Sequence, residues 1–117
     1  MGHEVLLVED DEDNAMMLSV YLRMEGHTVV VARDAESALN LAAASKPAVA
    51  IIDIGLPDVD GFTLARRLRE AYTSLPLIAV TGHETFGARQ RAKEAGIGTY
   101  LLKPIDLAEL DRVLAAI

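Results

Sequence analysis

Short apolar runs alternate along the chain with longer segments in which apolar residues recur at helical spacing. The runs are rich in branched residues and are bounded by Gly, Pro or charged residues, a pattern that predicts strands. The predicted strands are Glu4–Val8, Thr28–Ala32, Val49–Asp53, Leu77–Gly82 and Thr99–Leu102. The third run is apolar without alternation, which is typical of a strand buried on both faces of a parallel sheet.

Each segment that follows a predicted strand carries an apolar stripe on an otherwise polar helix. The stripes are Met17, Leu18, Tyr21 and Leu22; Ala38, Leu41 and Ala42; Leu64, Ala65 and Leu68; Ala88, Ala92 and Ala95; and Leu110, Val113, Leu114 and Ile117. We expect Asp34 and Asp106 to cap the second and last helices. Residues 11–13 are all acidic, and we assign them to the start of the first helix, where the helix dipole favours negative charge.

Strands that alternate with helices over the whole chain predict βαβ units, and therefore an α/β fold with a parallel sheet. Right-handed crossovers and short connections favour a five-stranded, doubly wound sheet with five helices and the flavodoxin-like strand order 2-1-3-4-5. The sequence contains no linker, repeat or low-complexity segment, so residues 1–117 are predicted to form one domain.

Polar side chains stand where four of the apolar runs end. Asp53 closes the most apolar run, and Glu9-Asp10, Thr81 and Lys103 stand at or directly beyond the ends of three others. In the predicted strand order the first, third, fourth and fifth strands have adjacent carboxyl ends. Open α/β sheets bind their ligands at these ends, so we expect the polar groups to share one crevice.

The three carboxylates of Glu9, Asp10 and Asp53 cannot all stay ionised in one small site without a cation. Mg²⁺ suits such all-oxygen ligation and keeps several of its waters. A carboxylate beside a metal, the Lys103 ammonium and the Thr81 hydroxyl is arranged to receive a phosphoryl group. Simpler interpretations stay open at this point: Asp53 as a turn cap, Lys103 as a surface lysine and Thr81 as an ordinary strand residue.

Composition excludes several classes of function. The net charge of -7 argues against binding to nucleic acid, and two Phe, three Tyr and no Trp provide no stacking surface for bases. The apolar runs are too short to cross a membrane, and no leader-like segment opens the chain. Without cysteines the chain has no thiol chemistry. We therefore expect a cytoplasmic protein.

Taken together, these motifs give the chain a resemblance to the receiver domain of two-component response regulators, over essentially its whole length. The residues that carry it are Glu9-Asp10, Asp53 within Ile51–Gly61, Thr81-Gly82 and Lys103-Pro104. The resemblance implies phosphoryl transfer to Asp53 from a histidine kinase or a histidine phosphotransfer domain. It also implies a Mg²⁺ site with Asp10 as a direct ligand, Glu9 acting through water, and Asp53 and the backbone carbonyl of Gly55 completing the set.

The same resemblance implies a conformational switch. Thr81 and Tyr100 match the switch pair of the family, which acts at the face formed by the fourth helix, fifth strand and last helix. Lys103 matches the lysine that binds the acyl phosphate, and the Lys103–Pro104 peptide is cis in that family. Such a domain phosphorylates and dephosphorylates itself, so it acts mainly as a signalling switch, as a monomer or weak dimer.

Other assignments remain to be weighed against this one. A phosphatase of the haloacid dehalogenase type needs a second Asp two residues after the nucleophile, where this chain has Gly55. A flavin-binding carrier needs hydroxyls and amides in its first loop, which here is acidic. A degenerate receiver would act only in protein binding. Gly55 and His83 occupy positions that tune phosphate lifetime in the family.

The output of the domain is not specified by these motifs. Segments 65–69, 79–83 and 102–107 are similar to receivers of hybrid sensor kinases. We therefore favour a receiver that is attached to, or excised from, a larger protein over a stand-alone receiver, with an output partner or effector that the sequence does not identify.

Overall fold

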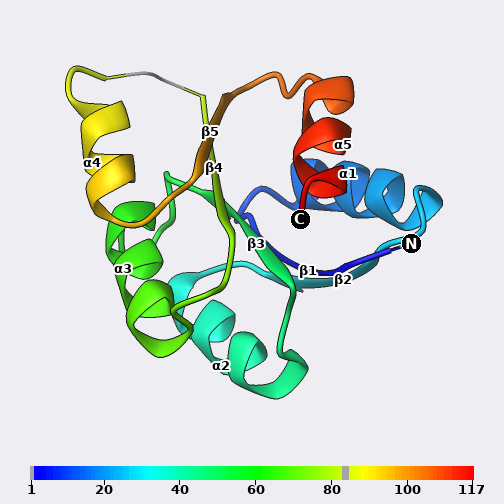
Figure 1. The fold of residues 1–117 in the computed structure, drawn as a ribbon, viewed down its shortest axis with the longest axis horizontal. Helices are drawn as coiled ribbons and strands as arrows, with labels where there is room; N and C mark the ends of the chain where they lie inside the picture. Colours follow the sequence, from blue (N-terminus) through cyan, green and yellow to red (C-terminus); the bar gives the residue numbers. More distant parts are fainter. Residues whose placement is uncertain (1, 83–84) are drawn as a thin grey trace.

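A five-stranded parallel sheet organises the part of the chain that the computed structural model describes, residues 2–82 and 85–117. The strands are β1 (Glu4–Val8), β2 (Thr28–Ala32), β3 (Val49–Asp53), β4 (Leu77–Thr81) and β5 (Thr99–Leu102). Their order is β2-β1-β3-β4-β5, and each neighbouring pair is parallel (Figure 1). The predicted fold class and strand order are confirmed.

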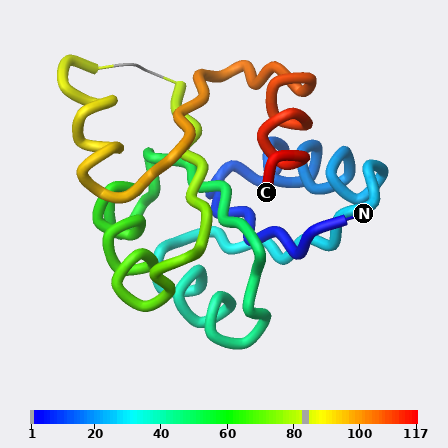
Figure 2. Tube along the Cα trace, in the orientation of Figure 1, coloured from blue at the N-terminus to red at the C-terminus, as the bar shows by residue number. Residues whose placement is uncertain are grey.

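Five helices cover the two faces of this sheet within the described residues. They are α1 (Glu12–Met24), α2 (Ala35–Ser45), α3 (Gly61–Ala71), α4 (Ala88–Glu94) and α5 (Leu107–Ala115). The helices α1 and α5 lie on one face, and α2, α3 and α4 lie on the other (Figure 1). Figure 2 shows the same two groups along the Cα trace, with the red α5 beside the blue α1.

Two hydrophobic clusters, one on each face, hold the layers together. Successive strand residues point to opposite faces, so Leu6 belongs to the cluster that includes residues of α2, α3 and α4, whereas Leu7 belongs to the cluster that includes residues of α1 and α5. The same alternation places Ile52 in the first cluster and Ile51 in the second, both at most 1% exposed. Asp53 is the first residue of β3 that escapes this double burial, because it lies at the strand end.

The helix ends follow the predicted signals. Asp34 accepts a hydrogen bond from the Ser37 backbone N–H at 2.8 Å and caps α2, and Asp106 caps α5 in the same way through Ala108 and Glu109. None of the helices in the described residues is long and apolar enough to cross a membrane.

Two predicted stripe residues do not face the core. Met17 is 69% exposed, and the buried side of α1 consists of Ala15, Leu18, Ser19 and Leu22. Each helical residue turns the side-chain direction by roughly 100°, so Met17 points away from the face that its neighbour Leu18 buries. Ile117 is 42% exposed because it lies beyond the end of α5 at Ala115.

Candidate functional site

The register of the sheet places the predicted polar residues at one edge. Val8 of β1 pairs with Ile52 of β3, so the residues that follow, Glu9 and Asp53, emerge side by side. On the other side of β3, Thr81 ends β4 and pairs with Leu102, the residue before Lys103. The backbone N–H of Lys103 donates to the Thr81 carbonyl at 2.8 Å, which fixes where the lysine leaves the sheet.

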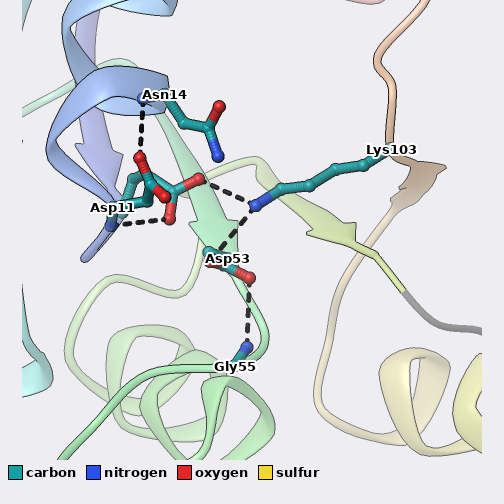
Figure 3. A network of polar contacts seen from close by, with 6 residues as sticks. Asp11, Asn14, Asp53, Gly55 and Lys103 are labelled. Carbon is teal, nitrogen blue, oxygen red and sulfur yellow. Dashed lines mark hydrogen bonds and ion pairs between the residues drawn. The ribbon is translucent and has the colours of Figure 1, made fainter.

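Lys103 connects two of the carboxylates. Its Nζ lies 2.9 Å from Oε1 of Glu9 and 3.4 Å from Oδ2 of Asp53, and Figure 3 shows its side chain extending from the end of β5 toward Asp53. The other oxygens are held by the backbone: Asp53 Oδ1 accepts from the Gly55 N–H at 3.1 Å, and Glu9 Oε2 accepts from the Asp11 N–H at 3.2 Å. Both carboxylates therefore have fixed orientations.

Asp10 completes a group of acidic ligands. One carboxylate oxygen from each of Glu9, Asp10 and Asp53 lies within 4.8 Å of the other two. Glu9 is buried and Asp10 is exposed, so the group opens to solvent on one side. The three carboxylates outnumber the Lys103 ammonium, so the site has an excess of negative charge. A hard divalent cation that prefers oxygen ligands, such as Mg²⁺, would neutralise this charge.

Burial and the contacts among Glu9, Asp53 and Lys103 shift the ionisation of the site. Burial, together with the hydrogen bond and charge of Asp53, raises the pKa of Glu9 to about 7. Burial lowers the pKa of Lys103, but the hydrogen bonds and charges of Glu9 and Asp53 more than offset this and raise it overall. Lys103 therefore stays protonated, and the metal-free site holds a proton on Glu9 at mildly acidic pH.

This proton makes stability depend on pH. The folded protein binds it up to about pH 7, whereas an unfolded Glu releases it near its ordinary pKa of about 4.3. The folded state binds more protons in this window, so the Glu9 contribution to the free energy of unfolding falls as pH rises from 5 to 8. Each pKa unit corresponds to about 1.4 kcal/mol, so we expect a loss of about 2 kcal/mol.

Urea unfolding in EDTA at pH 5 and pH 8 measures this loss when the parent is compared with Glu9→Gln, which has no proton to release. Glu94→Gln, a change at an exposed residue of α4, should keep the pH dependence of the parent. Parallel stability curves for the parent and Glu9→Gln would contradict the expected protonation.

The remaining predicted residues lie at or near the same edge. The Thr81 side chain is buried, and Tyr100 on β5 is half-buried with the Arg89 guanidinium 4.9 Å from its ring centre. The Lys103–Pro104 peptide bond is cis, as expected. Asp11 caps α1 by accepting from the Asn14 N–H at 3.0 Å, which confirms its assignment to the helix start.

Two features of the site were not predicted from the sequence. One is the contact of the Arg89 guanidinium with the Tyr100 ring, which the position of Arg89 in a predicted helix does not indicate. The other is an apolar groove of about 190 Å³ beside the ion pair, which Met17 and Ile105 help to line together with Glu9 and Lys103. His83, the second position of interest for phosphate lifetime, lies outside the described residues.

Comparison with known proteins identifies this arrangement. The sequence matches the family model of the response regulator receiver domain over residues 5–115. The chain belongs to the response regulator receiver domain family. A 14.6 kDa protein of Leptolyngbya boryana is 38% identical over 113 residues, covering 95% of this chain and 86% of that protein. The virulence transcriptional regulatory protein PhoP of Salmonella typhimurium is 37% identical over 106 residues.

The match to PhoP covers 91% of this chain but 47% of PhoP, so this receiver domain spans just under half of that relative. Among solved structures, the signal receiver domain of an HD domain-containing protein from Pseudomonas fluorescens Pf-5 is 34% identical, with a TM-score of 0.93. That alignment covers 99% of this chain and 94% of the other. These findings favour a receiver of two-component signalling over the phosphatase and flavin-carrier alternatives.

Proposed function

We propose that this receiver domain accepts a phosphoryl group on Asp53 from a phosphohistidine. The observation that carries the proposal is the Lys103 ammonium held between Glu9 and Asp53, 2.9 and 3.4 Å away, at the carboxyl end of the sheet. An ammonium at this position neutralises charge that a phosphoryl group brings to Asp53. The acidic group beside it suits the cation that phosphoryl transfer requires.

The residues of the chain divide the chemistry among them. A carboxylate oxygen of Asp53 forms a bond to phosphorus while the phosphorus–nitrogen bond of phosphohistidine breaks, and the imidazole keeps the electron pair and takes a proton. The Gly55 N–H and Lys103 orient the two oxygens of Asp53 before the reaction. Glu9, Asp10, Asp53 and the Gly55 carbonyl would hold Mg²⁺, which supplies positive charge for the phosphoryl oxygens.

A protein is the proposed donor, namely a histidine kinase or a histidine phosphotransfer domain. The apolar groove beside Lys103 and the exposed Met16, Met17 and Val20 of α1 give such a partner an apolar surface next to the site. A cytoplasmic location and one receiver domain over residues 1–117 remain predictions from the sequence, and a monomer or weak dimer with an output partner or attached effector remains a prediction from the resemblance.

We also propose that phosphorylation switches the face formed by α4, β5 and α5. Thr81 lies at the end of β4 next to the site, and Tyr100 lies on the adjacent β5. A phosphoryl group on Asp53 would attract the Thr81 hydroxyl and leave room for the Tyr100 ring to turn inward. The inward residues of α4, Ala88 and Ala92, are small and bury little apolar area, so we expect this helix to shift when the switch operates.

Acetyl phosphate with Mg²⁺ tests transfer, and beryllofluoride with Mg²⁺ tests the switch. With acetyl phosphate we expect a mass gain of one phosphoryl group that EDTA prevents, because transfer needs the cation. An unlabelled protein would favour a receiver that acts only in protein binding.

With beryllofluoride we expect amide exchange and chemical shifts to change at residues 85–106 as well as around Asp53. Changes confined to Glu9, Asp10 and Asp53 would contradict the switch.

A further inference from the structure

The loop at residues 54–60 joins β3 to α3 and carries Gly55. Its two ends are fixed by backbone hydrogen bonds: the Ile54 N–H donates to the Val80 carbonyl at 3.0 Å, and the Gly61 N–H donates to the Ile54 carbonyl at 3.0 Å. Between these points Gly55 must keep one orientation, because its N–H holds Asp53 Oδ1 while its carbonyl serves the proposed cation. Leu56 and Val59 pack against the buried cluster on this face of the sheet, and a polar contact in the middle of the loop would restrict its backbone further.

Asp58 provides a connection from the middle of this loop to a different helix. Its Oδ1 accepts from the Ala35 N–H at 2.9 Å, and its Oδ2 accepts from the N–H groups of Ala35 and Glu36 at 3.1 and 3.3 Å. The same carboxylate also accepts from the Val59 N–H at 2.9 Å, within the loop. One side chain thus ties the loop backbone to the first turn of α2.

The helix does not depend on Asp58 alone for its capping. Asp34 already caps α2 by accepting from the Ser37 N–H, and it leaves the N–H groups of Ala35 and Glu36 for Asp58. The N-terminus of α2 attracts a carboxylate through the helix dipole. Hydrogen bonds from Ala35, Glu36 and Val59 hold the pKa of Asp58 below its usual range, so its negative charge persists at neutral pH.

The first turn of α2 is a rigid point of attachment. Ala35 is 1% exposed, and Ala38 and Ala42, further along the same side of the helix, are fully buried in the cluster on that face of the sheet. A loop that is hydrogen-bonded to this turn is held in a fixed position relative to α2. The alternative explanation is that Asp58 only adds to the stability of α2, and that the packing of Leu56 and Val59 is enough to position the loop.

We propose that Asp58 is a positioning residue for the cation site, which acts by fixing the loop that presents Gly55 to the metal and to Asp53. The inference rests on the proposed function, because that proposal supplies the Mg²⁺ site. It concerns a residue that touches neither the cation nor the phosphoryl group. Its effect must therefore be visible both in the order of the loop and in cation affinity.

Asp58→Ala and Asp34→Ala form a matched pair that separates loop anchoring from helix stability. Each variant removes one carboxylate from the same helix end, but only Asp58 is part of the loop and ties it to α2. We expect both to lower the melting temperature by similar amounts. We expect only Asp58→Ala to weaken Mg²⁺ binding, by about tenfold, which is the lower end of the range for lost supporting contacts at metal sites. Calorimetry without any phosphodonor measures this affinity.

A second readout needs no metal. In EDTA, Asp58→Ala should speed amide exchange at Gly55 and Leu56, neither of which bonds to Asp58, and Asp34→Ala should not. Asp58→Asn, which keeps an oxygen acceptor, should lie between the parent and Asp58→Ala. Unchanged Mg²⁺ affinity and loop exchange in Asp58→Ala would overturn the inference, as would equal losses in Asp34→Ala. A parent that binds no Mg²⁺ would overturn the proposed function instead, and loop exchange would still decide whether Asp58 anchors the loop.

Discussion

Replacing Asp53 with Asn should reduce phosphorylation by acetyl phosphate to background. An amide is not a nucleophile toward phosphorus, and the substitution also removes one of the three carboxylates that would hold Mg²⁺. Asn is nearly the same size as Asp, and its amide oxygen can still accept from the Gly55 N–H, so the fold should be retained. Intact-protein mass after incubation with acetyl phosphate and Mg²⁺ gives the phosphorylated fraction.

Asp13→Asn is the matched control for this experiment. It makes the same chemical change at an exposed residue in the first turn of α1, and it should leave labelling at the parent level. Labelling of Asp53→Asn at the parent rate would show that the acceptor is elsewhere. Peptide mapping would then show whether Asp10, the exposed carboxylate of the same group, accepts the phosphoryl group instead.

Removing the Lys103 ammonium has the second-largest expected effect. In Lys103→Ala the rate of phosphorylation should fall by about a hundredfold, the lower end of the loss for removing one hydrogen-bond donor that stabilises the charge of a transition state. The metal-free protein should also lose stability at pH 8, because Glu9 and Asp53 would face each other without the ammonium that lies 2.9 and 3.4 Å from them. Rates at saturating Mg²⁺ separate the loss in transfer from any change in cation binding.

Lys93→Ala serves as the control, since Lys93 is an exposed residue of α4. It removes the same charge from the chain, so it reports the effect of net charge alone. If Lys103→Ala and Lys93→Ala were phosphorylated at equal rates, the ion pair with Glu9 and Asp53 would have no part in transfer, and the role proposed for Lys103 would be wrong.

Much of the fold could be predicted because its signals are local. Val49–Asp53 reads as a doubly buried strand from its composition alone, and Asp34 caps α2 through an N–H only three residues away. Parallel strands end at one edge of the sheet, so placing Glu9, Asp53 and Lys103 after strands was enough to predict that they meet. Strand order followed from connection rules rather than from any single residue.

The details of the site were decided only by the tertiary structure. Lys103 makes its shorter contact with Glu9 rather than with Asp53, and the Asp53 carboxylate that adds to the effect of burial on the pKa of Glu9 belongs to a different strand. The hydrogen bond from the Ala35 N–H to Asp58 spans 23 residues, and no pattern in the local sequence around either residue predicts it.

The same reason explains the errors on α1 and the contact missed on α4. Helical spacing placed Met17 in an apolar stripe, but the side that became buried is the one where α1 meets β1 and β2, and Ser19 lies there with its hydroxyl donating to the Met16 carbonyl. The position of Arg89 over Tyr100 likewise depends on where α4 lies relative to β5. Local sequence fixes which residues can form a helix or strand, whereas the path of the whole backbone decides which side chains meet across elements.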